Sequence, residues 1–319
     1  METSKHNRLW LILVIVLVIL VVGGLVFYLT KKRSNSSAAQ PAKNTNAWQE
    51  SGVAISGRFA DAEVVDLGNG QYRMYYSVEP EVPNNKLEVF SALSSDGKTW
   101  DKEEGTRKEF ATFTDVVKLS SGQFRMYFQN AQVIKSAIST DGLNFTDEPG
   151  ERIDKTETGF SLENVGAGST VQLEDGTFMM AYRGTINEPY QGEKVPNQNT
   201  QVYFYATSAD GLSFTKKGLA LDSRNDTLKG LSDGAEFVKW DNGELRLFFW
   251  SYSAIYHLTF NNEAFSKEPV FDFTNNKDTT KQFSENPPGD PTLVKIDGKW
   301  FMYYGQHTKG IYYANYLSR

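Results

Sequence analysis

The sequence predicts an all-β protein, a five-bladed β-propeller, because the chain repeats one phrase. Residues 64–76 (VVDLGNGQYRMYY) and 116–128 (VVKLSSGQFRMYF) are nearly identical, and weaker copies occupy residues 170–182, 237–249 and 293–304. Each copy is an apolar run, a short polar turn with glycine and an aromatic-rich run, which is typical of a β-hairpin. Hairpins that recur roughly every 50 residues indicate a propeller with one such hairpin in each blade.

A second phrase marks the outer half of three blades. Residues 94–100, 139–145 and 208–214 share the pattern Ser-x-Asp-Gly-x-x-aromatic, and a degenerate fourth copy ends at Phe265. Asp-Gly suits a turn that needs a positive φ, and the aromatic ring can then pack against the blade. We therefore expect strands A and B, a connection, strand C, the Asp-Gly turn and strand D in each blade.

The two ends of the chain are expected to meet in the last blade. The fifth copy has no strand D, because the chain stops just after residues 310–316 (GIYYANY). Residues 47–55 (AWQESGVAI) resemble residues 213–221 (SFTKKGLAL), which form strand D of the third blade. A closing N-terminal strand would remove the exposed sheet edges of the ring. A two-sheet β-sandwich is the alternative fold, but it does not explain the repeat.

The N-terminal segment has the pattern of a membrane anchor. Residues 1–8 form a short flank, and residues 9–29 are apolar and uncharged, long enough to cross a bilayer as a helix. Basic residues on both sides leave its orientation open. A cleaved signal peptide is the alternative, although its apolar region would be too long. We expect a transmembrane signal anchor at 9–29, a flexible linker at 30–46 and the propeller at 47–319, single-pass in the cell membrane with the propeller extracytoplasmic.

Composition excludes several classes of function. The chain has a formal net charge of −6, which argues against nucleic acid as a partner. It has no cysteine, so neither disulfides nor a lipid-anchoring cysteine are expected. With three histidines, neither a His-rich metal centre nor a Ser-His-Asp triad is expected.

Loop lengths indicate which face of the propeller carries the site. The A–B and C–D turns are short, and antiparallel alternation puts both sets on one face. The long insertions at 184–200, 222–233 and 274–290 fall on the opposite face. Long loops on one side of a rigid scaffold are where binding sites occur. We expect the site on this face, near the axis, where the five A strands begin.

Carboxylates gather at these strand starts. Aligning the five copies puts Asp61, Phe113, Ala167, Gly234 and Asp290 at one position, with Asp233 just before Gly234. Two residues further on, the aligned positions hold Glu63, Asp115, Ser169, Glu236 and Thr292. Acids that converge on a narrow channel raise one another's pKa values. One protonated and one ionised carboxylate are what hydrolysis of a glycosidic bond requires. The alternative for each acid is a turn cap or a solvated side chain.

On these features, residues 47–319 resemble the five-bladed propeller glycosidases: the arabinanases and xylosidases of glycoside hydrolase family 43, and more distantly the invertases and levansucrases of families 32 and 68. That family opens its first blade with Ala-Asp-Pro, whose Asp is the general base; Ala60 and Asp61 correspond, without the Pro. Its general acid, a Glu before Gly in the fourth blade, corresponds to Asp233, with Glu236 nearby. Its third-blade Asp corresponds to Ala167, so Asp115 or Asp290 would tune the charge instead.

Four further residues are expected to bind substrate. Arg183 ends strand B of the third blade, and Trp250 and Tyr252 lie on the expected rim, where they either stack on a sugar or pack a loop. His307 follows the last strand B, and the resemblance implies a calcium on the axis beside it; an ordinary hydrogen bond is the alternative. No cofactor is expected to be required.

The expected function is hydrolysis of an external oligo- or polysaccharide by paired carboxylates. A non-catalytic propeller that binds glycan or cell-wall material is the alternative, and the alanine at position 167 favours it. A sialidase-like enzyme is a second alternative, although sialidases resemble this chain less, with six blades and a longer Asp-containing turn.

Overall fold

The computed structural model describes residues 46–157, 159–187, 190, 199–252, 254–275 and 287–317. The flank and signal anchor expected at 1–8 and 9–29, and nearly all of the linker at 30–46, lie outside these residues. Within the described part of the chain, no helix has the length and apolarity needed to cross a membrane.

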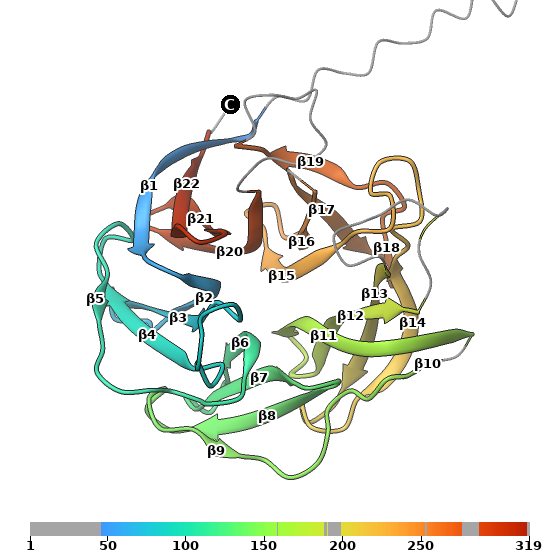
Figure 1. The fold of residues 1–319 in the computed structure, drawn as a ribbon, viewed down its shortest axis with the longest axis horizontal. Helices are drawn as coiled ribbons and strands as arrows, with labels where there is room; N and C mark the ends of the chain where they lie inside the picture. Colours follow the sequence, from blue (N-terminus) through green and yellow to red (C-terminus); the bar gives the residue numbers. More distant parts are fainter. Residues whose placement is uncertain are drawn as a thin grey trace, which may run out of the picture. The chain divides into compact units, whose positions relative to one another are not determined.

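Residues 45–319 form one compact unit in which five antiparallel sheets surround an axis (Figure 1). Blade one contains β2 (Phe59–Asp66), β3 (Tyr72–Val78), β4 (Val89–Ser94) and β5 (Asp101–Lys102), and blade two contains β6 (Thr112–Lys118), β7 (Phe124–Asn130), β8 (Val133–Ser139) and β9 (Thr146–Asp147). Blade three contains β10 (Thr156–Glu157), β11 (Phe160–Gln172), β12 (Phe178–Ile186), β13 (Thr200–Ser208) and β14 (Thr215–Leu221). The predicted five-bladed propeller is confirmed.

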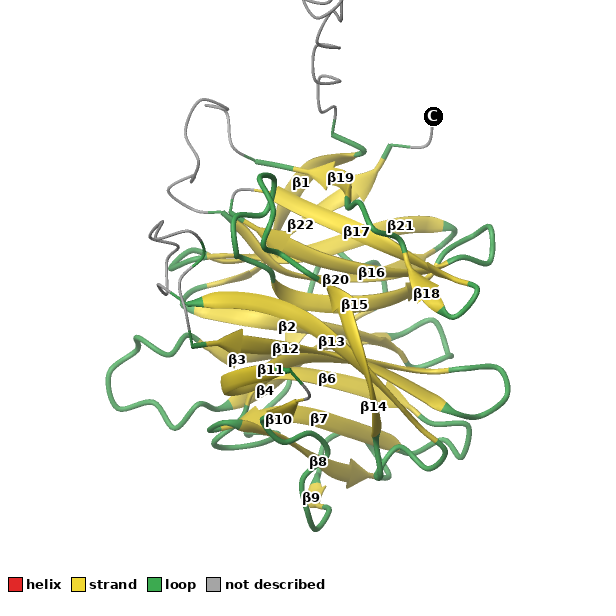
Figure 2. Ribbon diagram, turned by 90° about the vertical axis from the view of Figure 1, so that its right-hand side faces the viewer, coloured by secondary structure: helices red, strands yellow, loops and turns green. Residues whose placement is uncertain are grey.

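Blades four and five complete the ring. Blade four contains β15 (Asp233–Lys239), β16 (Leu245–Ser251), β17 (Ala254–Asn261), β18 (Ala264–Phe265) and β19 (Val270–Phe273), and blade five contains β20 (Pro288–Ile296), β21 (Lys299–Gln306), β22 (Gly310–Tyr316) and β1 (Trp48–Ser56). The innermost strands β2, β6, β11, β15 and β20 contact one another in turn around the axis. The sheets are stacked side by side with connecting loops at both ends (Figure 2).

The predicted closure of the ring is also confirmed. β1 pairs antiparallel with β22 as the outermost strand of blade five, in a register that runs from Trp48 opposite Tyr316 to Ser56 opposite Gly310. Trp48 is buried in the same hydrophobic cluster as Phe273 of blade four and Tyr304 of blade five. The N-terminal strand therefore completes a sheet and also packs against the neighbouring blade.

The two repeated phrases hold neighbouring blades together. The Tyr75 hydroxyl donates to the Gly142 carbonyl of the next blade at 2.8 Å, and Tyr127 donates to Gly211 at the same distance. Tyr303 of blade five likewise donates to Gly97 of blade one at 2.7 Å. Each tyrosine comes from the hairpin phrase, and each glycine comes from an Asp-Gly turn.

Blades three and four lack the tyrosine that joins the other blades to their neighbours. The positions equivalent to these tyrosines are Ala181 in blade three, opposite Ser169, and Phe248 in blade four, opposite Glu236. Blade four has no Asp-Gly turn for blade three to hold, and β1 replaces the outer strand of blade five. A tyrosine is therefore present where the next blade offers a turn carbonyl, which is why the two phrases occur together in the sequence.

Candidate active site

All five innermost strands begin with the same backbone distortion. Asp61, Phe113, Ala167, Gly234 and Asp290 have positive φ angles between 43° and 54°. The pairing register of each innermost strand shifts at the same place, as between Ala60 and Glu63 in blade one. These are β-bulges, which bend a strand and redirect its side chains. Left-handed backbone in non-glycine residues is strained and is typical of functional sites.

The bulges create two layers of side chains around the axis. We call Asp61, Phe113, Ala167, Gly234 and Asp290 the upper ring. We call Glu63, Asp115, Ser169, Glu236 and Thr292, two residues further along each strand, the lower ring. A cavity of about 30 Å³ lies between them and is lined by members of both rings. The sequence alignment of the repeats therefore identified two real structural layers.

Above the upper ring, a pocket of about 340 Å³ opens toward the B–C loops. Asp61, Asp290, Phe113 and Trp250 line its inner part. Glu79 and Glu81 follow β3, and His307 follows β21, at its outer part. The pocket lies on the face where the sequence predicted a site, because B–C connections reach only this end of the blades.

Two carboxyls in this pocket have shifted pKa values. Burial raises the pKa of Asp61 to about 6, and the negative charge of Asp233 adds to the shift. The Phe113 amide opposes that shift by donating to Asp61 Oδ2 at 3.2 Å. Burial, with the charges of Asp61 and Asp233, raises the pKa of Asp290 well above its usual range. The Trp250 indole donates to Asp290 Oδ1 at 3.1 Å, which fixes the orientation of that carboxyl.

Asp233 has a different environment from the other two acids. The Arg183 Nη1 donates to both carboxylate oxygens of Asp233, at 2.6 and 2.7 Å. Both side chains are buried, with 8% and 10% of their surfaces exposed. The guanidinium also lies over the Phe113 ring, 5.2 Å from its centre. The guanidinium of Arg183 is therefore held by its ion pair with Asp233. Neither Arg183 nor Asp233 lines the pocket.

The two predicted aromatic contacts differ in position. Trp250 lines the pocket beside Asp290. Tyr252 is 7% exposed, packs in a small cluster with Leu231 and Trp250, and donates its hydroxyl to the Lys229 carbonyl at 3.2 Å. Tyr252 therefore packs the loop that supports Trp250, which is the second of the two roles expected for a rim aromatic.

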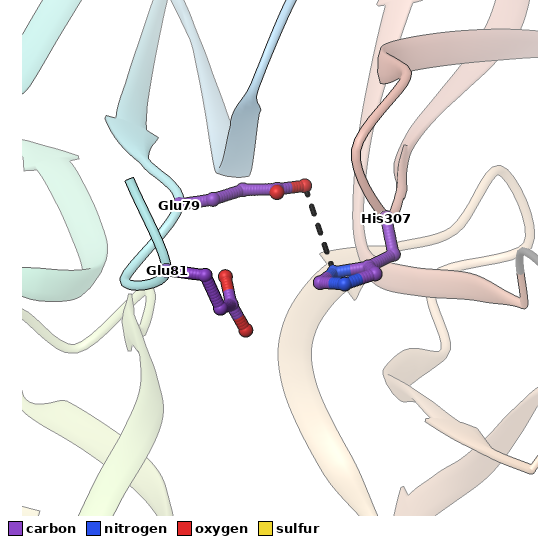
Figure 3. Close-up of side chains that lie close together, drawn as sticks. All are labelled: Glu79, Glu81 and His307. Carbon is purple, nitrogen blue, oxygen red and sulfur yellow. Dashed lines mark ion pairs between the residues drawn. The ribbon is translucent and has the colours of Figure 1, made fainter. Parts of the chain in front are cut away.

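His307 belongs to a cluster at the pocket mouth. Figure 3 shows Glu79, Glu81 and His307 pointing toward one another from two B–C loops. His307 Nδ1 lies 3.7 Å from Glu79 Oε1, which also accepts a hydrogen bond from the Thr308 amide at 2.6 Å. One ligand atom of each of the three residues lies within 4.8 Å of the others, which is close enough to share a metal ion.

The lower ring contains the other two acids predicted from the sequence. Carboxylate oxygens of Glu63, Asp115 and Glu236 lie within 4.8 Å of one another. Burial raises the pKa of Asp115 to about 7. Burial and neighbouring negative charges raise the pKa values of Glu63 and Glu236 well above their usual range. Asp115 and Glu236 are thus one layer below the pocket, apart from Asp61 and Asp290.

Sequence reasoning missed Glu63 as a site residue, and it also missed Glu79 and Glu81. Glu63 was visible in the alignment of the repeats, at the same position as Asp115 and Glu236. Glu79 and Glu81 lie just after strand B of blade one, the place that His307 occupies in blade five. Equivalent positions in neighbouring blades were therefore the signal that could have brought the mouth cluster together.

The chain matches no protein-family profile, and no curated protein is detectably similar to it in sequence. Its fold is nevertheless similar to several solved structures. A thermostable family-43 glycoside hydrolase matches with a TM-score of 0.61 and 16% identity, over 82% of this chain and 90% of the other. An endo-arabinase from Bacteroides thetaiotaomicron matches with a TM-score of 0.59 and 15% identity, over 84% and 98%.

A third similar structure belongs to a different glycosidase family. It comes from the GH130 family, described as mannoside phosphorylases that include glycoside hydrolases acting on β-1,2 mannosidic linkages in Candida mannan. It matches with a TM-score of 0.57 and 16% identity, over 82% of this chain and 85% of the other. The resemblance expected from the repeats is thus confirmed at the level of architecture: the chain has the five-bladed propeller fold of these glycosidases.

Proposed function

We propose that this protein hydrolyses glycosidic bonds of a carbohydrate bound in the pocket above the upper ring. One observation carries the proposal: Asp61 and Asp290 line the same pocket, and both have raised pKa values. A group with a pKa of about 6 is mostly ionised at neutral pH and can act as a base. Burial with the charges of Asp61 and Asp233 raises the pKa of Asp290 well above its usual range, which suits a carboxyl that donates a proton as an acid.

In this proposal Asp61 is the base or nucleophile, as expected from the sequence, and Asp290 is the general acid. The Trp250 indole occupies Asp290 Oδ1, so the acidic proton is carried by Oδ2. The Phe113 amide holds Oδ2 of Asp61. Asp233, aligned with the acid of family 43, is held in its ion pair with Arg183 and in this scheme contributes negative charge rather than a proton.

The mouth cluster is proposed to bind the outer part of the substrate. If the calcium implied by the resemblance is present, Glu79, Glu81 and His307 would hold it. Glu79 fits this role, because it is 2% exposed and its Oε2 accepts no hydrogen bond from the described residues, although Arg58 lies 3.8 Å away. A bound calcium would supply charge and orient sugar hydroxyls there. The two carboxyls act without it.

The test is a screen of aryl-glycosides and of plant and microbial polysaccharides against the full chain. Wild-type protein is expected to release product, and Asp61→Asn and Asp290→Asn are each expected to lower kcat by about a hundredfold or more. Asp66→Asn is the matched control, because Asp66 ends the same strand at the opposite face. Equal activity of Asp61→Asn and wild type on a cleaved substrate would exclude this mechanism.

A non-catalytic glycan-binding protein is the second candidate. Two observations favour it: Ala167 is the blade-three member of the upper ring, and Asp233, which precedes the ring member Gly234, is paired with Arg183. In that case the full chain would bind a glycan from the screen without cleaving it, and Trp250→Ala would abolish the binding. The sialidase-like alternative requires six blades, and the structure has five.

A further inference from the structure

The pocket above the upper ring is lined by four acids and by few groups of opposite charge. Asp61 and Asp290 lie at its inner part, and Glu79 and Glu81 lie at its mouth. Among the described residues that line it, none is a lysine or an arginine, and only His307 is able to carry a positive charge. Like charges repel, so this pocket disfavours sugars that carry a carboxylate, such as uronic acids.

Two arginines lie near these acids, but neither lines the pocket. Arg183 is held by its ion pair with Asp233. The Arg58 side chain is 47% exposed, and its Nε lies 3.8 Å from Glu79 Oε2, which is beyond hydrogen-bond distance. An ion pair that is half exposed to water compensates a buried charge only weakly. The negative charge of the mouth is therefore left largely for a ligand to neutralise.

A second observation, on Glu79 itself, shows which kind of group the mouth lacks. Glu79 is 2% exposed, and its Oε1 accepts a hydrogen bond from the Thr308 amide at 2.6 Å. Its Oε2 accepts no hydrogen bond from the described residues. Figure 3 shows the side chain reaching into the mouth toward His307. Buried polar atoms nearly always have a partner, and a buried carboxylate needs one most, so a donor from a ligand is indicated.

We propose that the substrate is a glycan that contains a hexosamine with a free amino group, and that this sugar lies at the pocket mouth. The inference rests on the proposed function, because it names the substrate class of the same pocket. A protonated amine brings a positive charge and three N–H donors. Glu79 and Glu81 offer carboxylate oxygens within 4.8 Å of each other, so one amine reaches both. Hydrogen bonds between charged partners are about twice as strong as neutral ones.

Other sugar substituents fit the mouth less well. A hydroxyl donates to a carboxylate but leaves its charge in place, and an N-acetyl group offers one neutral N–H donor. The pocket of about 340 Å³ is at the lower end of the range of roughly 300–1,000 Å³ for small-molecule sites, so it holds a short part of a glycan. The sugar with the amino group and the bond to be cleaved are therefore expected to lie close together.

The test compares sugars that differ in one substituent. Glucosamine, galactosamine and mannosamine are titrated into the full chain beside their N-acetylated forms, their parent sugars and the matching uronic acids, with binding followed by nuclear magnetic resonance. A chelator keeps metal ions from the mouth, and a pH of about 7 keeps the amine protonated, since a comparable α-amino group has a pKa of roughly 8. At least one amino sugar is expected to bind about tenfold more tightly than its parent sugar and its N-acetylated form, with the uronic acid weakest.

Glu79→Gln and Glu81→Gln are each expected to reduce this preference to about threefold or less. Glu79→Gln keeps an acceptor for the Thr308 amide, and Glu81 is exposed, so both changes remove charge with little effect on packing. Glu104→Gln is the matched control, because it removes the same charge from an exposed residue that does not line the pocket, and it is expected to keep the wild-type preference. Circular dichroism checks folding, and Glu81→Gln decides if Glu79→Gln is unfolded.

Asp61→Asn separates this inference from the proposed hydrolysis. It removes the proposed base and leaves the mouth intact, so it is expected to lose cleavage but to keep the preference for the amino sugar in binding. Wild-type protein that prefers the amino sugar and cleaves no glycoside would support the inference and contradict hydrolysis. The inference is overturned, even where hydrolysis is found, if no amino sugar binds, if a parent sugar or uronic acid binds as tightly, or if the preference survives in the folded mouth variants.

Discussion

The upper and lower rings lie two residues apart on the same five strands, yet their acids have different surroundings. In the upper layer, Asp61 and Asp290 open into a pocket of about 340 Å³ and are held by a backbone amide and an indole. In the lower layer, three acids face one another, and no described residue donates a hydrogen bond to Asp115 Oδ2. One bulged strand start, repeated five times, therefore places two layers of acids in different surroundings.

The largest expected effect is the difference in kcat between a variant of an upper-ring acid and a variant of a lower-ring acid. Asp61→Asn removes the proposed base and is expected to lower kcat by about 10³-fold on any substrate found in the screen. Glu236→Gln changes a lower-ring acid that does not line the pocket, and it is expected to lower kcat by less than about tenfold. Steady-state kinetics of both variants make the comparison. A similar loss in both would show that the two rings act as one catalytic unit.

The next effect concerns the Arg183 guanidinium, which pairs with Asp233 beside the upper ring, whereas among the described residues no lysine or arginine forms an ion pair with a lower-ring acid. Arg183→Met leaves Asp233 buried without its partner, and the free energy of unfolding is expected to fall by about 3–5 kcal/mol. Arg224→Met is the control, because the Arg224–Asp222 pair is about a third exposed or more and is expected to contribute less than about 1 kcal/mol. Urea unfolding of the two variants gives both values. A loss below about 1 kcal/mol in Arg183→Met would contradict the importance of this pair.

The fold and the positions of both rings could be predicted from the sequence because each copy of the repeat adopts the same local structure. An apolar run, a glycine turn and an aromatic run specify a hairpin wherever they occur, and equal spacing keeps the copies in register. Aligning Asp61 with Asp290 and Glu63 with Asp115 therefore placed them in layers that the structure also shows. The closing strand was predictable for the same reason, since β1 resembles a strand D.

The partners of each acid could not be predicted, because they depend on side chains from different blades. Arg183 reaches Asp233 across the boundary between blades three and four, and Trp250 of blade four reaches Asp290 of blade five. Nothing in the spacing of the repeats encodes these contacts. The loop residues Glu79 and Glu81 lie just after strand B, beyond the end of the repeated phrase, so they come together with His307 only when the positions that follow strand B are compared between blades.

The pH dependence of hydrolysis sharpens the comparison further. The raised pKa of Asp61, about 6, predicts the acidic limb of the activity profile. A base must be ionised, so protonation below pH 6 removes active enzyme, and kcat/KM is expected to fall about tenfold for each pH unit lost. The profile is measured between pH 4 and pH 8 under conditions where the protein stays folded. An acidic limb near pH 4 would mean that Asp61 keeps an ordinary pKa and is not the buried base.

The smallest expected effect is on the free energy of unfolding, when one tyrosine hydroxyl near each layer is removed. Tyr127, opposite Asp115 of the lower ring, donates to the Gly211 carbonyl of the next blade at 2.8 Å. Tyr203 donates to the Ala167 carbonyl of the upper ring, within its own blade, at 3.2 Å. Both side chains are buried, so each change to phenylalanine removes a hydrogen bond with little change in packing.

Tyr127→Phe is expected to lower the free energy of unfolding by about 1 kcal/mol, and Tyr203→Phe by roughly half as much, because its bond is longer. Urea unfolding of the two variants under identical conditions measures the difference. The larger loss is expected for Tyr127→Phe because its bond also joins two blades, as the lower ring does. If Tyr203→Phe costs as much or more, the upper layer would hold the propeller together as strongly as the lower layer, and the division of roles between the layers would not extend to stability.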